Sequence, residues 1–382
     1  MSLPSSSPHT SDDRDLLYSE LAAHDRLGEV LEKEPERTFV SDWNGEHPFA
    51  RSFLGELADV PVGALGALGT YSHMDEDTEL AAAVADLHVR RYGEPSVTAR
   101  RCVPGAGATS FLTTLLLYQF LDGVRELAYL PPVYYNAGWW IRRLGFTVHR
   151  VAPDVDFVED VPLRLPTGRC LLWLTDPVWF AGVPVGRATL DAIKDWQCRT
   201  GSTVIVDGTF QYMGWDGAGP EATEWLDPDL TFRLVCPTKT LALHGFRFAY
   251  ALVPERCATA FAELHGRLHG AAGLADRRFA HRAVAVLGAG DGALPLMRFA
   301  EARYRRLRAG GALPDAVEPV GGYFVFGRPA VAAHRIAGMD IACFGGSGHP
   351  GFVRVNLLNP SAVECLSAAI RSRDGKRPLD YG

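Results

Sequence analysis

Residues 235–250 read VCPTKTLALHGFRFAY. In this stretch a single lysine, Lys239, lies between an apolar run and a glycine-containing turn, and an arginine, Arg247, follows eight residues later. The apolar run 232–236 has the length and composition of a short buried strand, so Lys239 is expected just beyond a strand end. Partial loss of water there lowers the pKa of the lysine amine and makes it a usable nucleophile for Schiff-base chemistry. On this stretch alone, an ordinary surface lysine is the simpler interpretation.

Similar apolar runs recur along the middle of the chain and alternate with helical segments. Runs that are apolar throughout, rather than at every second residue, are typical of a parallel sheet that helices cover on both faces. The sequence therefore predicts an α/β fold. The predicted strands are 126–132, 147–151, 170–175, 203–206, 232–236 and 248–253, with one helix ending near residue 144 and another over 190–200.

Three polar residues, Asp176, Asp207 and Lys239, lie at or just past the ends of predicted strands. Open α/β sheets bind ligands beyond the carboxyl ends of their strands, so these side chains are expected to lie close together. The glycine-rich segment 101–110 adds a second signal, because a turn that opens a helix offers free N–H groups and a positive dipole end to a phosphate. The simpler alternatives are that Asp207 caps a turn and that the small residues allow close helix packing.

The segments outside this central region predict helices and a second structural unit. Residues 1–15 form a Ser/Pro/Asp-rich tail without the basic-then-apolar pattern of a signal peptide. Helices are predicted over 15–34 and 79–92, and 255–308 is mostly helical. The second unit comprises predicted strands at 320–326 and 352–358 and a helix over 360–371.

Composition narrows the classes of function that the chain can have. With 382 residues, the chain is long enough for two domains or for one large domain with an appendage. Its net charge of -7 disfavours nucleic-acid binding, and no apolar run approaches the roughly 18 residues of a membrane helix. The seven cysteines and twelve histidines show no metal-ligand spacing, so we expect no metal and a cytoplasmic location.

From about residue 39 to its end, the chain resembles the pyridoxal 5′-phosphate (PLP) enzymes of the aminotransferase class I/II family, which have fold type I and are aspartate-aminotransferase-like. The resemblance makes Lys239, beside Thr238, the Schiff-base lysine of the cofactor. Arg247 of Gly245-Phe246-Arg247 matches the arginine that holds the cofactor phosphate. Asp207 matches the aspartate that keeps the pyridinium nitrogen protonated and so makes the ring an electron sink.

The remaining site residues follow from the same resemblance. Tyr134 matches the aromatic residue that stacks on the ring, and Asp176 falls in the cofactor-binding loop. Arg354 matches the arginine that grips the substrate carboxylate in a bidentate pair. The phosphate-binding turn is assigned to Gly107, Ala108 and Thr109, a second substrate contact to Asn44, and the tyrosine that reaches the neighbouring subunit's phosphate to Tyr71.

The resemblance also implies an architecture and an assembly. It implies a large domain with a mostly parallel, seven-stranded-type sheet sandwiched by helices, and a smaller α+β C-terminal domain. The expected divisions are a tail, an arm and part of the small domain over 1–60, the PLP-binding domain over 61–265, and connecting helices with the small domain over 266–382. The protein is expected to be a homodimer.

Two positions depart from the family pattern. The family's second asparagine after the central strand, which donates to the phenolic oxygen of the cofactor, falls at Trp179. The tyrosine that donates to the same oxygen falls at Phe210. An indole N–H from Trp179 or a hydroxyl from Tyr212 would be the replacements, and simple drift to aromatic filler is the plainer interpretation.

Three functions remain open at this point. The first is an aminotransferase acting at the α-carbon of an amino acid with a free α-carboxylate, in specialised biosynthesis. The second is a non-transaminating relative that carries out β- or γ-elimination, replacement, cyclisation or oxidative deamination, which the changes at Trp179 and Phe210 favour. The third, an inactive α/β binding protein, is hard to reconcile with Lys239, Asp207, Arg247 and Arg354 together.

Overall fold

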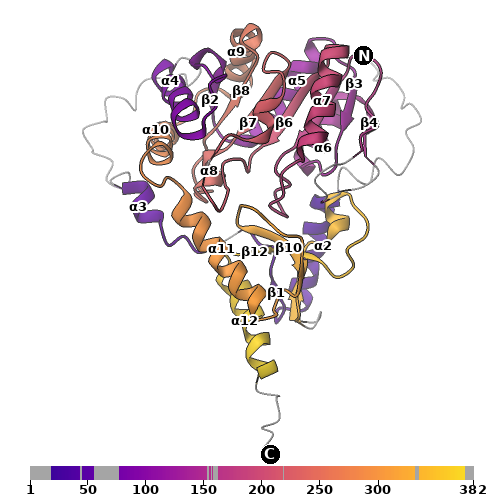
Figure 1. The fold of residues 1–382 in the computed structure, drawn as a ribbon, viewed down its shortest axis with the longest axis vertical. Coiled ribbons are helices and arrows are strands. Elements are labelled where there is room, and N and C mark those ends of the chain that lie inside the picture. Colours follow the sequence, from indigo (N-terminus) through magenta and orange to yellow (C-terminus); the bar gives the residue numbers. More distant parts are fainter. Residues whose placement is uncertain are drawn as a thin grey trace, which may run out of the picture.

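The computed structural model describes residues 19–43, 45–55, 77–152, 155, 157, 162–217, 219–331 and 335–374. Two predicted site residues, Asn44 and Tyr71, lie outside these ranges. Figure 1 shows a large sheet with helices in the upper part of the molecule and a smaller sheet with further helices below it. Within the described residues no helix combines the length and apolar character needed to cross a bilayer.

A seven-stranded sheet forms the larger part and has the order β2-β8-β7-β6-β5-β3-β4. β8 runs against its neighbours β7 and β2, and the other pairs are parallel, so the predicted mostly parallel sheet is confirmed. β2 was not predicted, because four residues that include a proline and a glycine carry little strand signal. The strands are β2 (Cys102–Gly105), β3 (Glu126–Tyr129), β4 (Thr147–Arg150), β5 (Leu171–Thr175), β6 (Thr203–Gly208), β7 (Thr231–Val235) and β8 (Ala249–Leu252).

Helices bury both faces of this sheet, which explains why its strands are apolar throughout. Leu171 and Trp173 of β5 pack with α5 (Ala108–Leu121), α6 (Tyr135–Leu144) and α9 (Ala258–His269) in one core cluster. Leu172 and Leu174, which point to the opposite face, pack instead against α7 (Arg187–Thr200). Both sets are completely buried, as expected for the inner strands of a three-layer α/β structure.

A group of helices packs beside β2 and joins the two parts of the molecule. The helix predicted over 79–92 is α4 (Thr78–Leu87), which continues into the π-helix η3 (His88–Tyr92). Asp77 caps α4 by accepting a hydrogen bond from the Leu80 N–H. α10 (Leu274–Gly288) packs against both α4 and α3 (Ala50–Leu54). The short helices elsewhere are η4 (Ala99–Arg101), η5 (Ala222–Trp225), α8 (Pro237–Thr240), η6 (Glu255–Cys257) and η8 (Ile341–Phe344).

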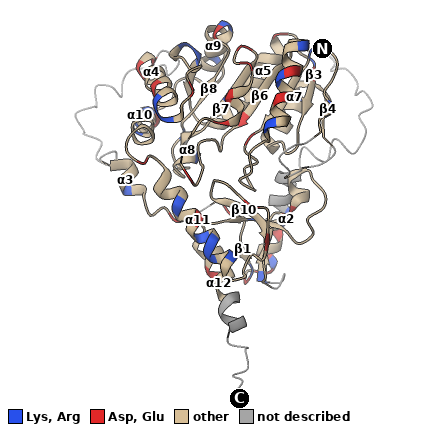
Figure 2. Cartoon of the chain, viewed as in Figure 1, with Lys and Arg blue, Asp and Glu red and all other residues tan. Residues whose placement is uncertain are grey.

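The smaller part combines the two ends of the chain. Its antiparallel sheet has the order β12-β10-β9, and β1 near the N-terminus pairs with β11. Figure 2 shows Lys and Arg along α11, where Arg305 pairs with Glu301 and Arg303 with Glu46 of the N-terminal segment. The elements are α2 (Ser19–Lys33), β1 (Thr38–Phe39), α11 (Leu294–Ala309), β9 (Asp315–Ala316), β10 (Phe324–Arg328), β11 (Ile336–Ala337), β12 (Val353–Asn356) and α12 (Pro360–Asp374).

Candidate active site

A cavity of about 140 Å³ lies at the carboxyl ends of β5, β6 and β7. Thr175, Asp207 and Cys236, which lie at or next to the ends of these strands, contribute to its wall. This is the edge of an α/β sheet at which ligands bind. Nine of the residues predicted from the sequence meet here, namely Ala108, Thr109, Tyr134, Trp179, Asp207, Phe210, Thr238, Lys239 and Arg247.

Lys239 reaches the cavity because the chain turns immediately after β7. Pro237 begins the short helix α8, and the Lys239 N–H donates to the Cys236 carbonyl at 2.8 Å. The proline suits the first turn of a helix, where its missing N–H costs nothing. The ammonium nitrogen of Lys239 lies 4.0 Å from the centre of the Trp43 ring, on the cavity side of the strand end.

One end of the cavity is built to bind an anion. Gly107 precedes α5 with a φ of +83°, and Ala108 and Thr109 in the first turn of that helix line the cavity. A Cβ added at Gly107 would lie 2.8 Å from a guanidinium nitrogen of Arg247, so the arginine packs directly on the glycine backbone. The free N–H groups of a helix start together with a guanidinium fit a phosphate group.

The cavity wall also carries a buried carboxylate. Asp207 has only 5% of its surface exposed, and both the backbone N–H and the hydroxyl of Thr209 donate to its Oδ1. Burial raises the pKa of Asp207, and the two hydrogen bonds from Thr209 oppose that rise. A cationic N–H partner would stabilise the ionised carboxylate, so the site fits a protonated pyridine nitrogen. Phosphate-binding and ring-binding groups therefore line one and the same cavity.

The two substituted positions, Trp179 and Phe210, both line this cavity. The Phe210 ring contributes no hydrogen bond. The indole Nε1 of Trp179 is buried and has no hydrogen-bond partner among the described residues. Phe210 packs at 6.2 Å from the Trp43 ring and 5.8 Å from that of Tyr323, so aromatic groups replace the polar pair on this side of the cavity.

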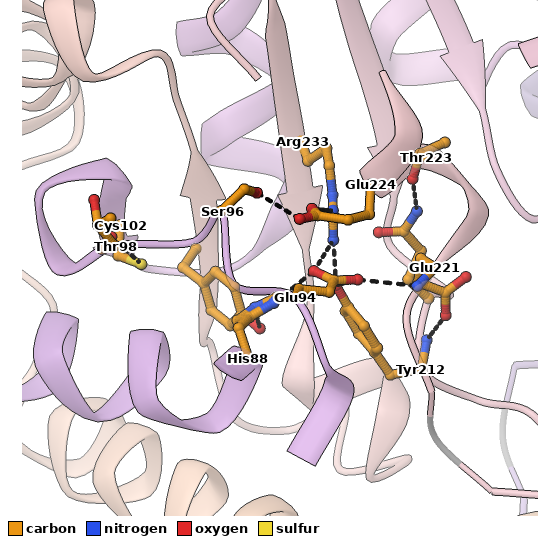
Figure 3. A network of polar contacts seen from close by, with 12 residues as sticks. His88, Glu94, Ser96, Thr98, Cys102, Tyr212, Glu221, Thr223, Glu224 and Arg233 are labelled. Atoms are coloured by element: carbon orange, nitrogen blue, oxygen red, sulfur yellow. Dashed lines mark hydrogen bonds and ion pairs between the residues drawn. The ribbon is translucent and has the colours of Figure 1, made fainter. Parts of the chain in front are cut away.

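The hydroxyl of Tyr212, the other possible replacement donor, is hydrogen-bonded within a buried polar network (Figure 3). It donates to Glu94 at 2.9 Å and also contacts the guanidinium of Arg233. Burial alone would raise the pKa of Glu94, but Arg233 and the hydrogen bond with His88 lower it to about 2. The Tyr212 ring stacks on Tyr92 with a 3.8 Å separation. Tyr212 therefore stabilises the loop after β6 and does not line the cavity.

Two other predicted residues, Asp176 and Arg354, do not line the cavity either. Asp176 is completely buried and accepts a hydrogen bond from the Val185 N–H at 2.8 Å; burial raises its pKa to about 6. Arg354 has no exposed surface, and its Nη2 donates to the Ser41 carbonyl at 2.8 Å. The carboxylate-binding role of Arg354 thus stays a prediction.

Several wall residues were not predicted from the sequence. Trp43 lies next to the predicted Asn44, and His244 lies within the stretch 235–250 itself, so position in the sequence could have suggested both. Burial, and then the charge of Lys239, lower the pKa of His244 to about 3, which keeps the imidazole neutral at physiological pH. The unpredicted wall residues are Trp43, Leu112, Thr175, Pro177, Thr209, Cys236 and His244.

The fold and this cavity define a PLP-dependent enzyme of fold type I. A family model described as "Aminotransferase class I and II" matches residues 28–298, and the chain belongs to that family. Members of the family depend on PLP, and the residues around the cavity fit that cofactor. No curated protein matches the sequence.

Solved structures with the same fold share little sequence with this chain. A single mutant of Thermus thermophilus aspartate aminotransferase is 19% identical, with a TM-score of 0.72 over 92% of this chain and 95% of the other. The methionine aminotransferase YbdL from Escherichia coli is 17% identical, with a TM-score of 0.71 over 92% and 96% of the two chains. Apo-BacF from Bacillus subtilis is 16% identical, with a TM-score of 0.74 over 96% and 98%. At such identities the likeness concerns the fold alone.

Proposed function

We propose that this enzyme acts at the α-carbon of an amino acid with a free α-carboxylate, as an aminotransferase of specialised biosynthesis. The observation that carries the proposal is the convergence of Lys239, Asp207 and Arg247 on one cavity. These residues lie on different elements, and each has the chemical character that its assigned role requires. Arg354 and Asn44 are proposed to bind the substrate.

Each residue contributes a definite physical task to the reaction. PLP, when bound, withdraws electrons from the substrate α-carbon. The amine of Lys239 would remove the proton from that carbon and deliver it to C4′ of the cofactor, because a lysine near the reacting atoms acts as a general base and then as a general acid. Asp207 stabilises the positive charge on the ring nitrogen. The start of α5 and Arg247 hold the phosphate and so fix the cofactor position.

Borohydride reduction followed by peptide mapping tests the assignment of Lys239. The chain contains only four lysines, Lys33, Lys194, Lys239 and Lys376, so the labelled peptide is unambiguous. We expect the pyridoxyl group on Lys239 and no label in Lys239→Arg. Lys194→Arg is the matched control, because Lys194 lies on α7 against the Trp225 ring and away from the cavity. Label on any other lysine would refute the assignment.

A second candidate function is a PLP reaction without amino-group transfer. The specific observation in its favour is that Trp179 and Phe210 line the cavity where the family has hydrogen-bond donors, while Tyr212 is engaged by Glu94. Loss of donors to the phenolic oxygen changes the electronics of the cofactor and the fate of the substrate carbanion. A screen of amino acids separates the candidates: amino-group transfer to a keto acid supports the first, whereas released ammonia without transfer supports the second.

The variant Phe210→Tyr tests the physical basis of this second candidate. Without the usual donors, the Schiff base between Lys239 and the cofactor should keep its proton well above neutral pH, because hydrogen bonds to the phenolate favour the deprotonated form. Restoring one hydroxyl should lower that pKa, and a spectrophotometric pH titration of both proteins measures the shift. If the wild type already titrates near neutrality and Phe210→Tyr leaves the value unchanged, another group fills the site, with the Trp179 indole as the first candidate.

The proposed assembly is a cytoplasmic homodimer in which Tyr71 reaches the phosphate of the neighbouring active site. Mixing the inactive variants Lys239→Ala and Tyr71→Phe provides a test. If Tyr71 acts across the dimer, each mixed dimer contains one site with both native residues, and activity should rise after subunit exchange. Activity that remains at the sum of the two separate variants would indicate that Tyr71 acts within its own chain or not at the site.

A further inference from the structure

Trp43 contacts two cationic side chains, Lys239 and Arg354, which the proposed function assigns to the substrate α-carbon and α-carboxylate. Its indole lines the cavity, with the Lys239 nitrogen 4.0 Å from the ring centre. The guanidinium carbon of Arg354 lies 4.9 Å from the same ring. Both distances are within the range of cation–π attraction. Trp43 therefore contacts both the lysine that acts at the substrate α-carbon and the arginine assigned to the substrate carboxylate.

Three aromatic rings lie around the guanidinium of the buried Arg354. Besides Trp43, the rings of Phe324 and Phe344 lie 4.9 and 5.7 Å from its guanidinium carbon, and the arginine has no exposed surface. Of these three rings only Trp43 lines the cavity. Arg354 itself neither lines the cavity nor has exposed surface, so of these rings Trp43 is the one that lies at the cavity wall beside the arginine.

Packing makes Trp43 the ring most able to move. Phe324 and Phe344 are buried, with 0% and 4% of their surfaces exposed, whereas Trp43 is only partly buried. Trp43 meets Phe324 edge-on at 5.0 Å, and it meets Phe210 at 6.2 Å across the cavity. Such contacts are individually weak, and an indole at the cavity surface can turn without opening the core.

We propose that Trp43 is a specificity-determining residue, whose indole covers Arg354 until a substrate α-carboxylate displaces it. This inference rests on the proposed carboxylate-binding role of Arg354. A carboxylate makes a bidentate, charge-assisted pair that is stronger than the cation–π contact it replaces. An amine or amide without that carboxylate offers no such exchange, so the indole keeps it out. Selection for a free α-carboxylate thus depends on both the arginine and its cover.

Chemical modification of arginine tests the cover without requiring turnover. The PLP-loaded enzyme is treated with phenylglyoxal, and the rate at Arg354 is followed by peptide mapping. Arg354 should be protected in the wild type and in Trp43→Phe, which keeps an aromatic cover, and should react about tenfold faster in Trp43→Ala. Circular dichroism and the cofactor absorption band establish that each variant is folded and loaded. Equal rates at Arg354 in all three proteins would overturn the proposal.

A kinetic comparison tests the consequence for specificity. The best amino acid from the screen and its α-carboxamide are compared by kcat/KM. The ratio should fall about tenfold in Trp43→Ala, because the amide gains access, and should be retained in Trp43→Phe. Should Trp43→Ala not fold, Trp43→Leu replaces it in both experiments. If Arg354 is modified faster in Trp43→Ala but the kcat/KM ratio is unchanged, the proposal is also overturned, and the error lies in the carboxylate-binding role of Arg354. Borohydride mapping tests the assignment of Lys239 separately.

Discussion

Asp207 and Asp176 show how two similar residues acquire different surroundings. Both are buried carboxylates near the ends of neighbouring parallel strands, and the Asp176 N–H donates to the Asp207 carbonyl. Only Asp207 lines the cavity, whereas Asp176 accepts a hydrogen bond from Val185 in the loop that leads from β5 to α7. The difference at the residue scale lies in the direction of one side chain.

This contrast predicts unequal effects of matched substitutions. Asp207→Asn should lower kcat about a hundredfold or more, roughly 3 kcal/mol of transition-state stabilisation, because the ring nitrogen loses its charged partner. Asp176→Asn should leave the cofactor absorption spectrum unchanged and affect mainly thermal stability. Steady-state kinetics and absorption spectra of both variants decide the matter. Equal losses of kcat would assign Asp176 to the cofactor site, as the sequence first indicated.

At the scale of elements, the start of α5 links backbone conformation to anion binding. Gly107 and Gly123 flank this helix with φ values of +83° and +89°, so an alanine at either position is strained by a similar amount. A Cβ at Gly123 meets nothing within 4 Å, whereas one at Gly107 collides with Arg247. The two glycines therefore form a matched pair of test positions.

Gly107→Ala should weaken PLP binding more than Gly123→Ala does. Both variants lose about 1 kcal/mol of stability from the positive φ, but only Gly107→Ala displaces the guanidinium from the phosphate end of the cavity. Titration of each apoenzyme with PLP, followed by absorbance, measures the dissociation constant. Identical constants for the two variants would show that Arg247 adapts or that the phosphate binds elsewhere.

At the scale of the whole molecule, a buried polar network connects three segments: η3, strand β7 and the loop that follows β6 (Figure 3). Glu221 accepts a hydrogen bond from the Tyr212 N–H, while its own N–H donates to Glu94 at 2.9 Å. Burial and then the nearby charge of Asp176 raise the pKa of Glu221 to about 8, and Arg233 partly offsets the rise. This network therefore contains a carboxyl group that binds its proton more tightly in the folded protein.

The raised pKa of Glu221 predicts a pH-dependent stability. The folded state holds this proton more tightly, so the contribution of Glu221 is present below its ordinary pKa of 4.5 and is lost as pH rises toward 8. Glu221→Gln keeps the hydrogen-bond acceptor but cannot ionise. Its melting temperature relative to wild type should therefore increase between pH 5 and pH 9, and calorimetry measures this difference. Glu263→Gln on the surface of α9 corrects for removal of an exposed charge, and a pH-independent difference for Glu221→Gln would contradict the assignment.

The sequence by itself determined the fold class and the family-like order of cofactor residues. Apolar runs report burial on both faces of a sheet, and residues that follow such runs, Lys239 and Asp207 among them, lie at the carboxyl edge wherever the strands are parallel. These are properties of short segments and need no knowledge of distant contacts. The antiparallel strand β2 escaped prediction because its four residues are ordered mainly by pairing with β8.

Only the tertiary structure decided which side chains turn toward the cavity. Tyr212 is drawn away by Glu94 and Arg233, which are 118 and 21 residues distant in sequence. Trp43 reaches Lys239 and covers Arg354 because the N-terminal segment packs against β12, where the Asn356 N–H donates to the Val40 carbonyl. Side-chain direction depends on partners that the chain meets only after folding, so no local pattern contains it.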